Sequence, residues 1–159
     1  MALVLEDPHL PNEKRSEEGF RDGARLLGRE KVGIKVWRYP GDLRRVRYLA
    51  ERLIEGPEAV TVALITNAYH FLALFSIFAR MGVRVPEDIS LVSRNDEHFF
   101  RFLDPEPARY TCLPQTRAKA VLSALMRTIQ GEHLPKRHFL LVPDFIAGAT
   151  VAGSSVVRR

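Results

Sequence analysis

The spacing of apolar residues changes repeatedly along the chain, and this alternation predicts the order of strands and helices. Continuous or alternating apolar runs, which are typical of strands, cover residues 2–5, 32–39, 60–66 and 89–92. Apolar residues three or four positions apart, which are typical of amphipathic helices, cover residues 13–27, 43–54, 69–81 and 114–130. A short aromatic segment and three extended pieces complete the pattern, over residues 96–103, 110–113, 139–142 and 145–147.

This order, in which each strand is followed by a helix, predicts an α/β fold: a parallel twisted sheet with helices on both faces. The uninterrupted apolar run at residues 60–66 fits a parallel strand that is buried on both faces. The helix at residues 69–81 is apolar nearly all round, so it must be covered on two sides. Right-handed crossovers then bring the strand-to-helix loops to one edge of the sheet.

The composition limits the class of protein. With 159 residues, of which 46% are hydrophobic and 27% charged, the chain is predicted to form one globular domain. No apolar run approaches the roughly 18 residues of a membrane span, and the first residues lack the basic start of a secretory signal. A single cysteine, Cys112, excludes an internal disulfide. The cytoplasm is therefore the predicted location, and a buried apolar role is predicted for the thiol.

The net charge of +5 raises the question of nucleic-acid binding. The 24 basic residues are scattered: Arg44, Arg45 and Arg47 share one predicted helix, and no basic run is interleaved with aromatic residues. A solvated basic surface is the preferred interpretation, so direct binding of these residues to nucleic acid is not predicted.

Motifs for catalysis, nucleotides or metals are absent from the sequence. It has neither the Walker spacing nor G-x-G-x-x-G, and it has no G-x-S-x-G. His133 and His138 have the spacing of zinc ligands, but no cysteine pair accompanies them. His98 beside Asp96 and Glu97 has the chemistry of a general base, although a polar loop histidine is the simpler interpretation. We therefore predict no cofactor, no metal and no enzymatic activity.

Hydrogen-bonding side chains instead gather at the carboxyl ends of two predicted strands, the edge where open α/β sheets bind ligands. Asn67 follows one strand, and Asn95 and Asp96 follow the next. Amides donate and accept hydrogen bonds and a carboxylate accepts from two hydroxyls, so these groups suit a polyhydroxylated ligand. An aromatic ring, Tyr69 or Trp37, would cover its apolar face. Capping of the following helices by Asn67 and Asp96 is the alternative, and both roles can coexist because a cap uses only one oxygen.

Several segments resemble the LacI/GalR family of transcription regulators. Residues 62–67 read Val-Ala-Leu-Ile-Thr-Asn, and residues 82–96 read Gly-Val-Arg-Val-Pro-Glu-Asp-Ile-Ser-Leu-Val-Ser-Arg-Asn-Asp. The family has an apolar strand ending in Asn-Asp, then a helix, then Gly-x-x-Val-Pro-x-Asp-Ile-Ser-Val and a paired Asp-Asp. Further matches at Gly19-Phe20, Pro105 and Tyr110-Thr111 extend the resemblance over nearly the whole chain.

In this family two α/β lobes, like those of periplasmic sugar-binding proteins, enclose an effector, and an N-terminal helix-turn-helix headpiece binds DNA. The resemblance implies that residues 1–159 form the C-terminal lobe of a LacI-type regulator, without the headpiece and most of the first lobe. Its expected functions are sensing of a sugar-like effector and homodimerisation, with DNA contacted only through such a headpiece. A transport-type sugar-binding protein and, less favoured, a small α/β enzyme remain the alternatives.

The resemblance also assigns site residues one by one. Asn67 matches the family's ligand-binding Asn. Asn95 stands at the first of the paired aspartates and Asp96 at the second, so one charge-assisted acceptor is replaced by an amide. The family's ligand-binding Arg would fall on Ser16, and Arg15, one residue earlier, is the candidate for its role.

Two surfaces follow from the resemblance. The helix after Asn67 and the loop after the paired acids form the family's dimer contact, which here comprises Leu72, Phe75, Ala79, Phe99, Phe100, Phe102 and Leu103. Burial of these phenylalanines as local core is the alternative. The helix after Pro114 normally packs beside the first lobe. Its apolar stripe therefore lacks that cover, at Ala118, Val121, Leu122, Leu125, Met126 and Ile129. We expect this helix to dock on a partner chain, to swap, or to fold back onto its own lobe.

Overall fold

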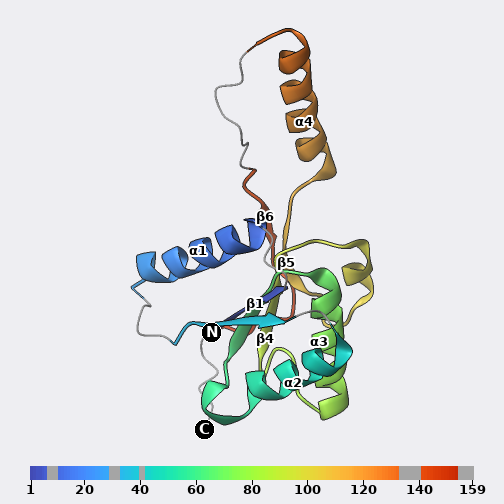
Figure 1. The fold of residues 1–159 in the computed structure, drawn as a ribbon. Helices are drawn as coiled ribbons and strands as arrows, with labels where there is room; N and C mark the ends of the chain where they lie inside the picture. The colour runs from blue at the N-terminus through green and yellow to red at the C-terminus, as the bar shows by residue number, and fades with distance from the viewer. Residues whose placement is uncertain (7–10, 29–32, 40–41, 133–140, 154–159) are drawn as a thin grey trace.

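Figure 1 shows the computed structural model of the chain, which describes residues 1–6, 11–28, 33–39, 42–132 and 141–153. Six strands in this part of the chain form one sheet, in the order β2-β1-β3-β4-β5-β6. The strands are β1 (Ala2–Glu6), β2 (Lys35–Tyr39), β3 (Val62–Ile65), β4 (Ser90–Ser93), β5 (Ala108–Thr111) and β6 (Asp144–Ile146). Strands β1 to β5 run parallel, which confirms the predicted α/β class.

The sheet departs from the prediction at its last strand. β6 pairs antiparallel to β5, with Tyr110 opposite Phe145 and the two rings 5.2 Å apart. A short apolar run does not encode the direction of a strand, since direction depends on the route of the connecting chain. Of the strand predicted at residues 139–142, the first two residues lie outside the described residues, and residues 141–142 are not in a strand.

The helices are α1 (Pro11–Leu26), α2 (Leu43–Ile54), α3 (Ala68–Met81) and α4 (Pro114–Ile129), with 3-10 turns η1 (Gly56–Glu58) and η2 (His98–Phe102). All four α-helices lie within about two residues of their predicted bounds because local signals set their ends. The Asp42 side chain accepts a hydrogen bond from the Arg45 backbone N at 3.0 Å and so caps α2. Gly82 ends α3 in the left-handed conformation, at φ 72°.

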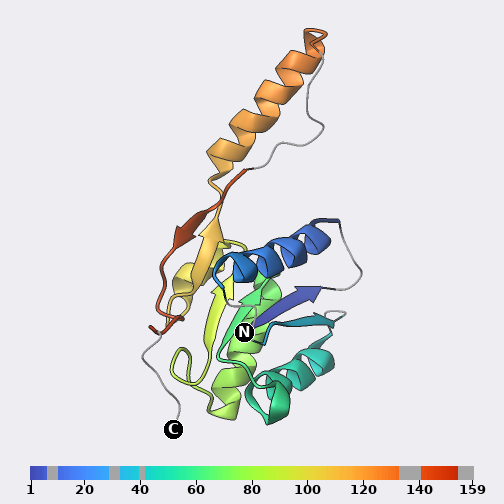
Figure 2. The same ribbon diagram turned by 90° about the vertical axis from the view of Figure 1, so that its left-hand side faces the viewer.

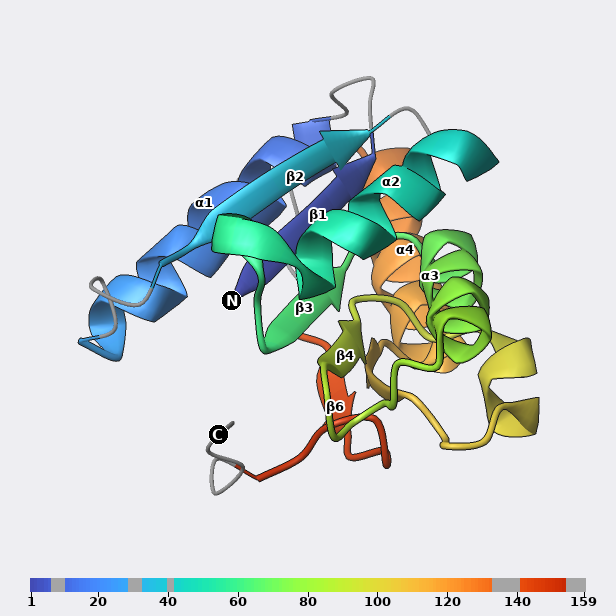
Figure 3. The ribbon, with the colours of Figure 1, turned by 90° about the horizontal axis from the view of Figure 1, so that it is seen from below.

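The core lies between the sheet and the pair α2 and α3. Figure 3 shows these two helices on one face of the sheet and α1 on the other. Side chains from α2, α3 and the strands are fully buried between the helices and the sheet. They include Leu53, Phe71, Phe78, Ala63, Ile65 and Leu91. The prediction that the apolar helix at residues 69–81 is covered on two sides is confirmed, since α3 packs against both α2 and the sheet.

Helix α4 projects away from the sheet and from the other helices (Figures 1 and 2). None of its residues is buried. The expectation that this helix folds back onto its own lobe is therefore wrong, whereas docking on a partner chain and swapping stay open. None of the described helices is long and apolar enough to cross a membrane.

Candidate functional site

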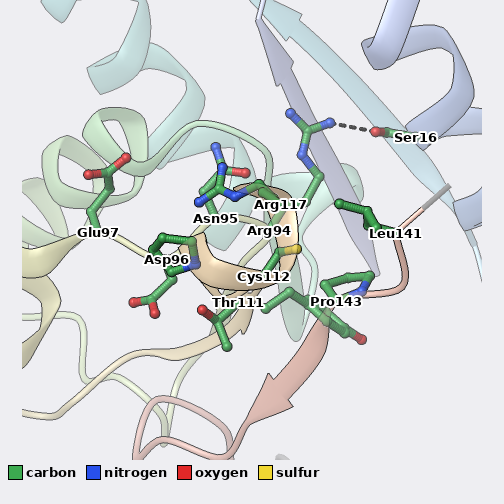
Figure 4. A pocket seen from close by; sticks show the side chains of 12 residues that line it. Ser16, Arg94, Asn95, Asp96, Glu97, Thr111, Cys112, Arg117, Leu141 and Pro143 are labelled. Atoms are coloured by element: carbon green, nitrogen blue, oxygen red, sulfur yellow. Dashed lines mark hydrogen bonds between the residues drawn. The ribbon is translucent and has the colours of Figure 1, made fainter. Parts of the chain in front are cut away.

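A cavity of about 690 Å³ lies at the carboxyl end of the sheet, where β4 and β5 end and α4 begins (Figure 4). Asn95 and Asp96, two of the predicted ligand residues, line this cavity. Its other lining residues are Ser16, Arg94, Glu97, Tyr110, Thr111, Cys112, Pro114, Arg117, Leu141 and Pro143. Its volume falls within the range of small-molecule sites, and its lining mixes charged, polar and apolar groups.

The carboxylate of Asp96 is held in place by a buried arginine. Arg109, in β5, is only 4% exposed, and its Nε donates to Asp96 Oδ1 at 2.7 Å. Its Nη1 donates to Glu106 Oε1 and to the Pro107 carbonyl, both at 2.9 Å. Because the guanidinium is planar and held at several points, it fixes the orientation of the Asp96 carboxylate at the cavity wall. No described residue donates a hydrogen bond to Asp96 Oδ2, which leaves that oxygen able to accept from a ligand.

Asp96 does not cap the turn that follows it. The residue at the N-cap of η2 is Glu97, and its side chain makes no capping bond. The capping interpretation of Asp96 is therefore wrong, because the ion pair with Arg109 directs its carboxylate elsewhere.

The neighbouring Asn95 is anchored to the strand ends. Its Nδ2 donates to the Thr66 carbonyl at 3.0 Å, which links the end of β4 to the end of β3. The Ser93 hydroxyl accepts from the Asn95 backbone N at 3.2 Å and donates to the Asn95 carbonyl at 2.8 Å. The backbone at the cavity wall is thus fixed, while the Oδ1 atom of Asn95 has no partner among the described residues.

Asn67 has the capping role that the sequence offered as an alternative. Its Oδ1 accepts from the backbone N atoms of Tyr69 at 2.9 Å and of His70 at 3.4 Å, at the start of α3. Its Nδ2 donates to Glu6 Oε2 at 2.8 Å. The cap is confirmed. Asn67 does not line the 690 Å³ cavity, so a ligand contact there stays a prediction.

The other two predicted ligand residues also lie outside the cavity lining. Tyr69 is 69% exposed, and its ring lies 5.8 Å from that of Phe99. Arg15 is exposed on α1, whereas its neighbour Ser16 lines the cavity. The arginines that line the cavity are Arg94 and Arg117.

Arg94 comes directly after β4 and is held by α1. Its Nη2 donates to Glu13 Oε1 at 2.7 Å, and its Nη1 donates to the Ser16 hydroxyl (Figure 4). Glu13 is buried in the first turn of α1, so its charge is balanced by Arg94. The sequence does not reveal this pair because its members lie about eighty positions apart. The one available signal is a charged residue placed immediately at the end of an apolar strand.

His70 lies in the first turn of α3 and is buried. Burial lowers the pKa of this imidazole below its ordinary value of 6.5, and the nearby Glu6 and Glu13 carboxylates oppose that shift. Its Nε2 lies 4.0 Å from Glu6 Oε1. His98, the candidate general base, stacks on Phe102 with the ring centres 5.5 Å apart and does not line the cavity. Among the described residues no group of three or more His, Cys, Asp or Glu side chains is arranged to hold a metal.

The residues predicted for the dimer contact separate into two sets. Phe100 is 0% exposed, because its ring packs edge-on against Phe71 and Phe99 with ring centres 5.2 Å and 4.8 Å apart. Its assignment to an exposed contact is therefore wrong, and it belongs to the core. Phe102, by contrast, is 75% exposed. Side chains that are exposed or half-buried make up the rest of the predicted set, at Leu72, Phe75, Ala79, Phe99 and Leu103.

Comparison with known proteins gives consistent matches over this chain. Residues 1–151 match the family model of a periplasmic binding protein-like domain. A curated relative, the HTH-type transcriptional repressor PurR of Vibrio atlanticus, is 28% identical over 103 residues, which are 64% of this chain and 30% of that protein.

Solved structures show the same fold. A LacI family transcriptional regulator from Bifidobacterium animalis subsp. lactis superposes with a TM-score of 0.81 at 19% identity, over 97% of this chain and 55% of that one. The transcription regulator CcpA of Lactococcus lactis gives a TM-score of 0.77 at 18% identity, over 95% and 55%. The chain thus spans about half the length of these solved relatives and less than a third of the curated one.

Proposed function

Since this chain belongs to the periplasmic binding protein-like domain family, we propose that it is the effector-sensing lobe of a LacI-type transcription regulator. The resemblance to LacI/GalR regulators drawn from residues 82–96 is confirmed by the relatives that the chain matches. Binding of a small molecule, rather than catalysis, is the activity that this function requires. In such a regulator the lobe acts in the cytoplasm, where the DNA lies.

The observation that carries the proposal is the cavity wall formed by Asn95 and Asp96. Arg109 fixes one oxygen of Asp96 and leaves the other without a partner among the described residues. The amide oxygen of Asn95 is similarly available. Two acceptors from adjacent residues in one cavity lining suit the hydroxyl groups of a sugar-like ligand, and the ring of Tyr110 in the same lining offers an apolar surface.

The proposed mechanism is a shift between two arrangements of lobes. This chain supplies one wall of the effector site. A second lobe, like the one in the half of the solved relatives that this chain does not cover, supplies the opposite wall. An effector that contacts both walls stabilises the arrangement in which they lie close together, by the difference in its affinity for the two arrangements. Contact with DNA belongs, in this proposal, to a headpiece outside these residues.

Thermal unfolding of the chain in the presence of neutral sugars, sugar phosphates and purine bases tests the ligand class. A neutral sugar at a hundredfold excess over its Kd is expected to raise the Tm by roughly 5–10 °C. Replacement Asp96→Asn should weaken that ligand about tenfold or more, because a charged acceptor becomes an amide. Glu106→Gln is the matched control, since Glu106 also binds Arg109 but does not line the cavity.

Equal loss of binding in both variants would assign the effect to Arg109 and not to a ligand contact of Asp96. No stabilisation by any compound of the panel at millimolar concentration would count against effector binding by this lobe.

We further propose homodimerisation through α3 and η2, with Phe100 removed from the predicted contact. A cavity of about 180 Å³ bordered by Phe75, Ala79 and Pro105 leaves room beside this surface for side chains of a partner. Phe102→Asp should lower the dimer fraction in sedimentation equilibrium by placing a charge in the contact. Tyr48→Asp, at a similarly exposed aromatic residue on α2, should leave it unchanged. A dimer that tolerates Phe102→Asp would rule out this surface.

A further inference from the structure

The last described segment of the chain is built into the sheet at the point where β4 and β5 separate. The two strands pair only at Val92 with Ala108 and at the next residue of each strand. One residue earlier on β4, the backbone N of Leu91 donates instead to the carbonyl of Thr150 at 2.9 Å. Thr150 therefore continues the hydrogen bonding of β4 where β5 no longer reaches it.

The hydroxyl of Thr150 joins the two strands. It donates to the Leu91 carbonyl at 2.6 Å and accepts from the Ala108 backbone N at 2.9 Å. Thr150 is 0% exposed, so both bonds lie in the interior, where a polar group that loses its partner is costly. This one side chain therefore fixes the first residue of β5 relative to β4.

The two residues before Thr150 hold the segment that leads into β5. The Ala149 backbone N donates to the Glu106 carbonyl at 2.7 Å. Gly148 lies so close to this segment that a Cβ built on it would come within 2.3 Å of both backbone atoms of the Pro107–Ala108 peptide bond. A side chain has no room in such an approach, which a glycine allows. Together the three residues form what we call the C-terminal clamp.

A single peptide group connects the C-terminal clamp to Arg109. The N–H of the Pro107–Ala108 peptide donates to the Thr150 hydroxyl, and its carbonyl accepts from Arg109 Nη1 at 2.9 Å. Because a peptide group is planar and rigid, its N–H and C=O cannot turn independently. Loss of the hydroxyl would therefore let this plane rotate and would shift the guanidinium bound to its other side.

The guanidinium of Arg109 in turn orients the carboxylate of Asp96. Arg109 is only 4% exposed, and its Nε donates to Asp96 Oδ1 at 2.7 Å. Its other carboxylate partner, Glu106, has a side chain that is 52% exposed, so solvent weakens that contact. The buried Pro107 carbonyl is therefore a firmer point of attachment than Glu106, and the C-terminal clamp fixes that carbonyl.

We propose that Thr150 and Gly148 are positioning residues of the effector site: they fix Arg109 through the backbone of β5, and through Arg109 they orient the carboxylate of Asp96. The inference rests on the proposed function, because Asp96 is the proposed ligand contact. A carboxylate that is oriented from the interior need not be ordered when an effector binds, so less binding free energy is lost.

Hydrogen exchange of the Arg109 Nε–H, followed by NMR on the isotope-labelled chain, tests this link without any ligand. Thr150→Val keeps the shape of the side chain and removes its hydroxyl. We expect exchange of this proton to accelerate about tenfold, the factor that corresponds to one buried hydrogen bond. Thr150→Ser, which keeps the hydroxyl, should stay close to the rate of the parent chain.

Val46→Ala controls for a general loss of stability. Val46 is buried on α2, which packs near β2 at the opposite end of the sheet from β5. This variant should lower the Tm but leave the Arg109 Nε–H exchange unchanged under native conditions. Equal acceleration in Val46→Ala and Thr150→Val would mean that the proton exchanges only through global unfolding, which would contradict control by the C-terminal clamp.

The glycine provides a second measurement. Gly148→Ala should displace the C-terminal clamp, because its Cβ has no room beside the Pro107–Ala108 peptide. Gly153→Ala, later in the same segment, is the matched control, since its Cβ meets no heavy atom within 4 Å. The NMR signal of the Arg109 Nε–H should shift in Gly148→Ala and stay in place in Gly153→Ala.

Ser90→Ala is a milder change that serves if a variant of the C-terminal clamp does not fold. The Ser90 hydroxyl accepts from the Ala152 backbone N at 3.2 Å, just beyond the C-terminal clamp. Its loss should accelerate the Arg109 exchange in the same direction as Thr150→Val, by a smaller factor.

An Arg109 Nε–H that exchanges at the parent rate in folded Thr150→Val would overturn the proposal. If that variant does not fold, an unchanged rate in Ser90→Ala would do the same. Accelerated exchange in Thr150→Val, combined with no stabilisation of the parent chain by any sugar, would count against the proposed function and would leave the positioning of Arg109 by Thr150 supported.

Discussion

Helices α3 and α4 are both rich in apolar side chains, yet only α3 is buried in this chain. Six residues of α3 are buried, at Ala68, His70, Phe71, Leu74, Ile77 and Phe78, whereas α4 has none. The difference lies in position: α3 connects two neighbouring parallel strands and must pack on the sheet, while α4 leaves the sheet after β5. An amphipathic pattern therefore predicts a helix with an apolar face but not where its partner lies.

The two helices also differ at their N-termini. Asn67 accepts two backbone hydrogen bonds at the start of α3, while Leu113 gives α4 no side-chain cap. Helices of about 15 residues are marginal in water without tertiary packing. With neither a side-chain cap nor cover from this lobe, α4 is expected to be less stable than α3.

The largest expected effect comes from truncating one apolar side chain in each helix. Phe78→Ala should lower the free energy of unfolding by about 3–5 kcal/mol, because a fully buried ring is lost and a cavity remains. Leu125→Ala should change it by less than about 0.5 kcal/mol in the monomer, because its side chain is already exposed. Urea unfolding followed by circular dichroism measures both. A large loss for Leu125→Ala at a concentration where the chain is monomeric would show that α4 packs on its own lobe.

Replacing an arginine in β5 and an arginine on α4 compares the cost of losing a buried and a projecting charged side chain. Arg109→Leu should cost about 3 kcal/mol, because Asp96 and Glu106 lose the buried partner that holds them. Arg117→Leu, in the first turn of α4, should stay within about 0.5 kcal/mol. Chemical denaturation of both variants is the measurement. Similar losses in the two would mean that the projecting helix is held as firmly as the strand before it.

Removing the cap of α3 and adding one to α4 tests how much the caps contribute to the difference between the two helices. Asn67→Ala should destabilise the fold by about 1 kcal/mol through loss of the cap on α3. Leu113→Asp should instead add a cap to α4, followed by a proline at the first helical position, and stabilise that helix by about 0.5–1 kcal/mol. Amide hydrogen exchange in residues 114–129 would slow accordingly. Unchanged exchange there would mean that tertiary contacts, and not the missing cap, limit α4.

The elements were predictable because their signals are local. Caps at Asn67 and Asp42 and the left-handed Gly82 set helix ends to within about two residues. Asn95 and Asp96, which the resemblance to a known family assigned to a ligand, line the cavity, and their contact with a ligand stays a prediction. The same resemblance also placed the uncovered stripe on α4.

The features that could not be predicted from the sequence depend on contacts between distant segments or on local geometry. Arg109 holds Asp96 from another strand, and Arg94 reaches back to Glu13 on α1. The error at Phe100 has a simple cause. A 3-10 turn has three residues per turn, so successive rings point about 120° apart and, with Phe99 only half-buried at the edge, a single ring enters the core fully. Phe100 does so, while Phe102 points into solvent.

The smallest expected effect, a dependence of stability on pH, again separates the two helices. Burial lowers the pKa of His70 in the folded chain below the 6.5 of an unperturbed imidazole. Below about pH 6.5 the unfolded chain therefore binds more protons at this residue, so the free energy of unfolding falls as the pH is lowered. His70→Gln should flatten this decline between about pH 7.5 and about pH 5, measured by urea unfolding at each pH. His98→Gln, at an exposed site, is the control, and equal flattening in that variant would assign the decline to the surface. Residues 114–129 contain no histidine or carboxylate, so α4 itself should stay insensitive over the same range.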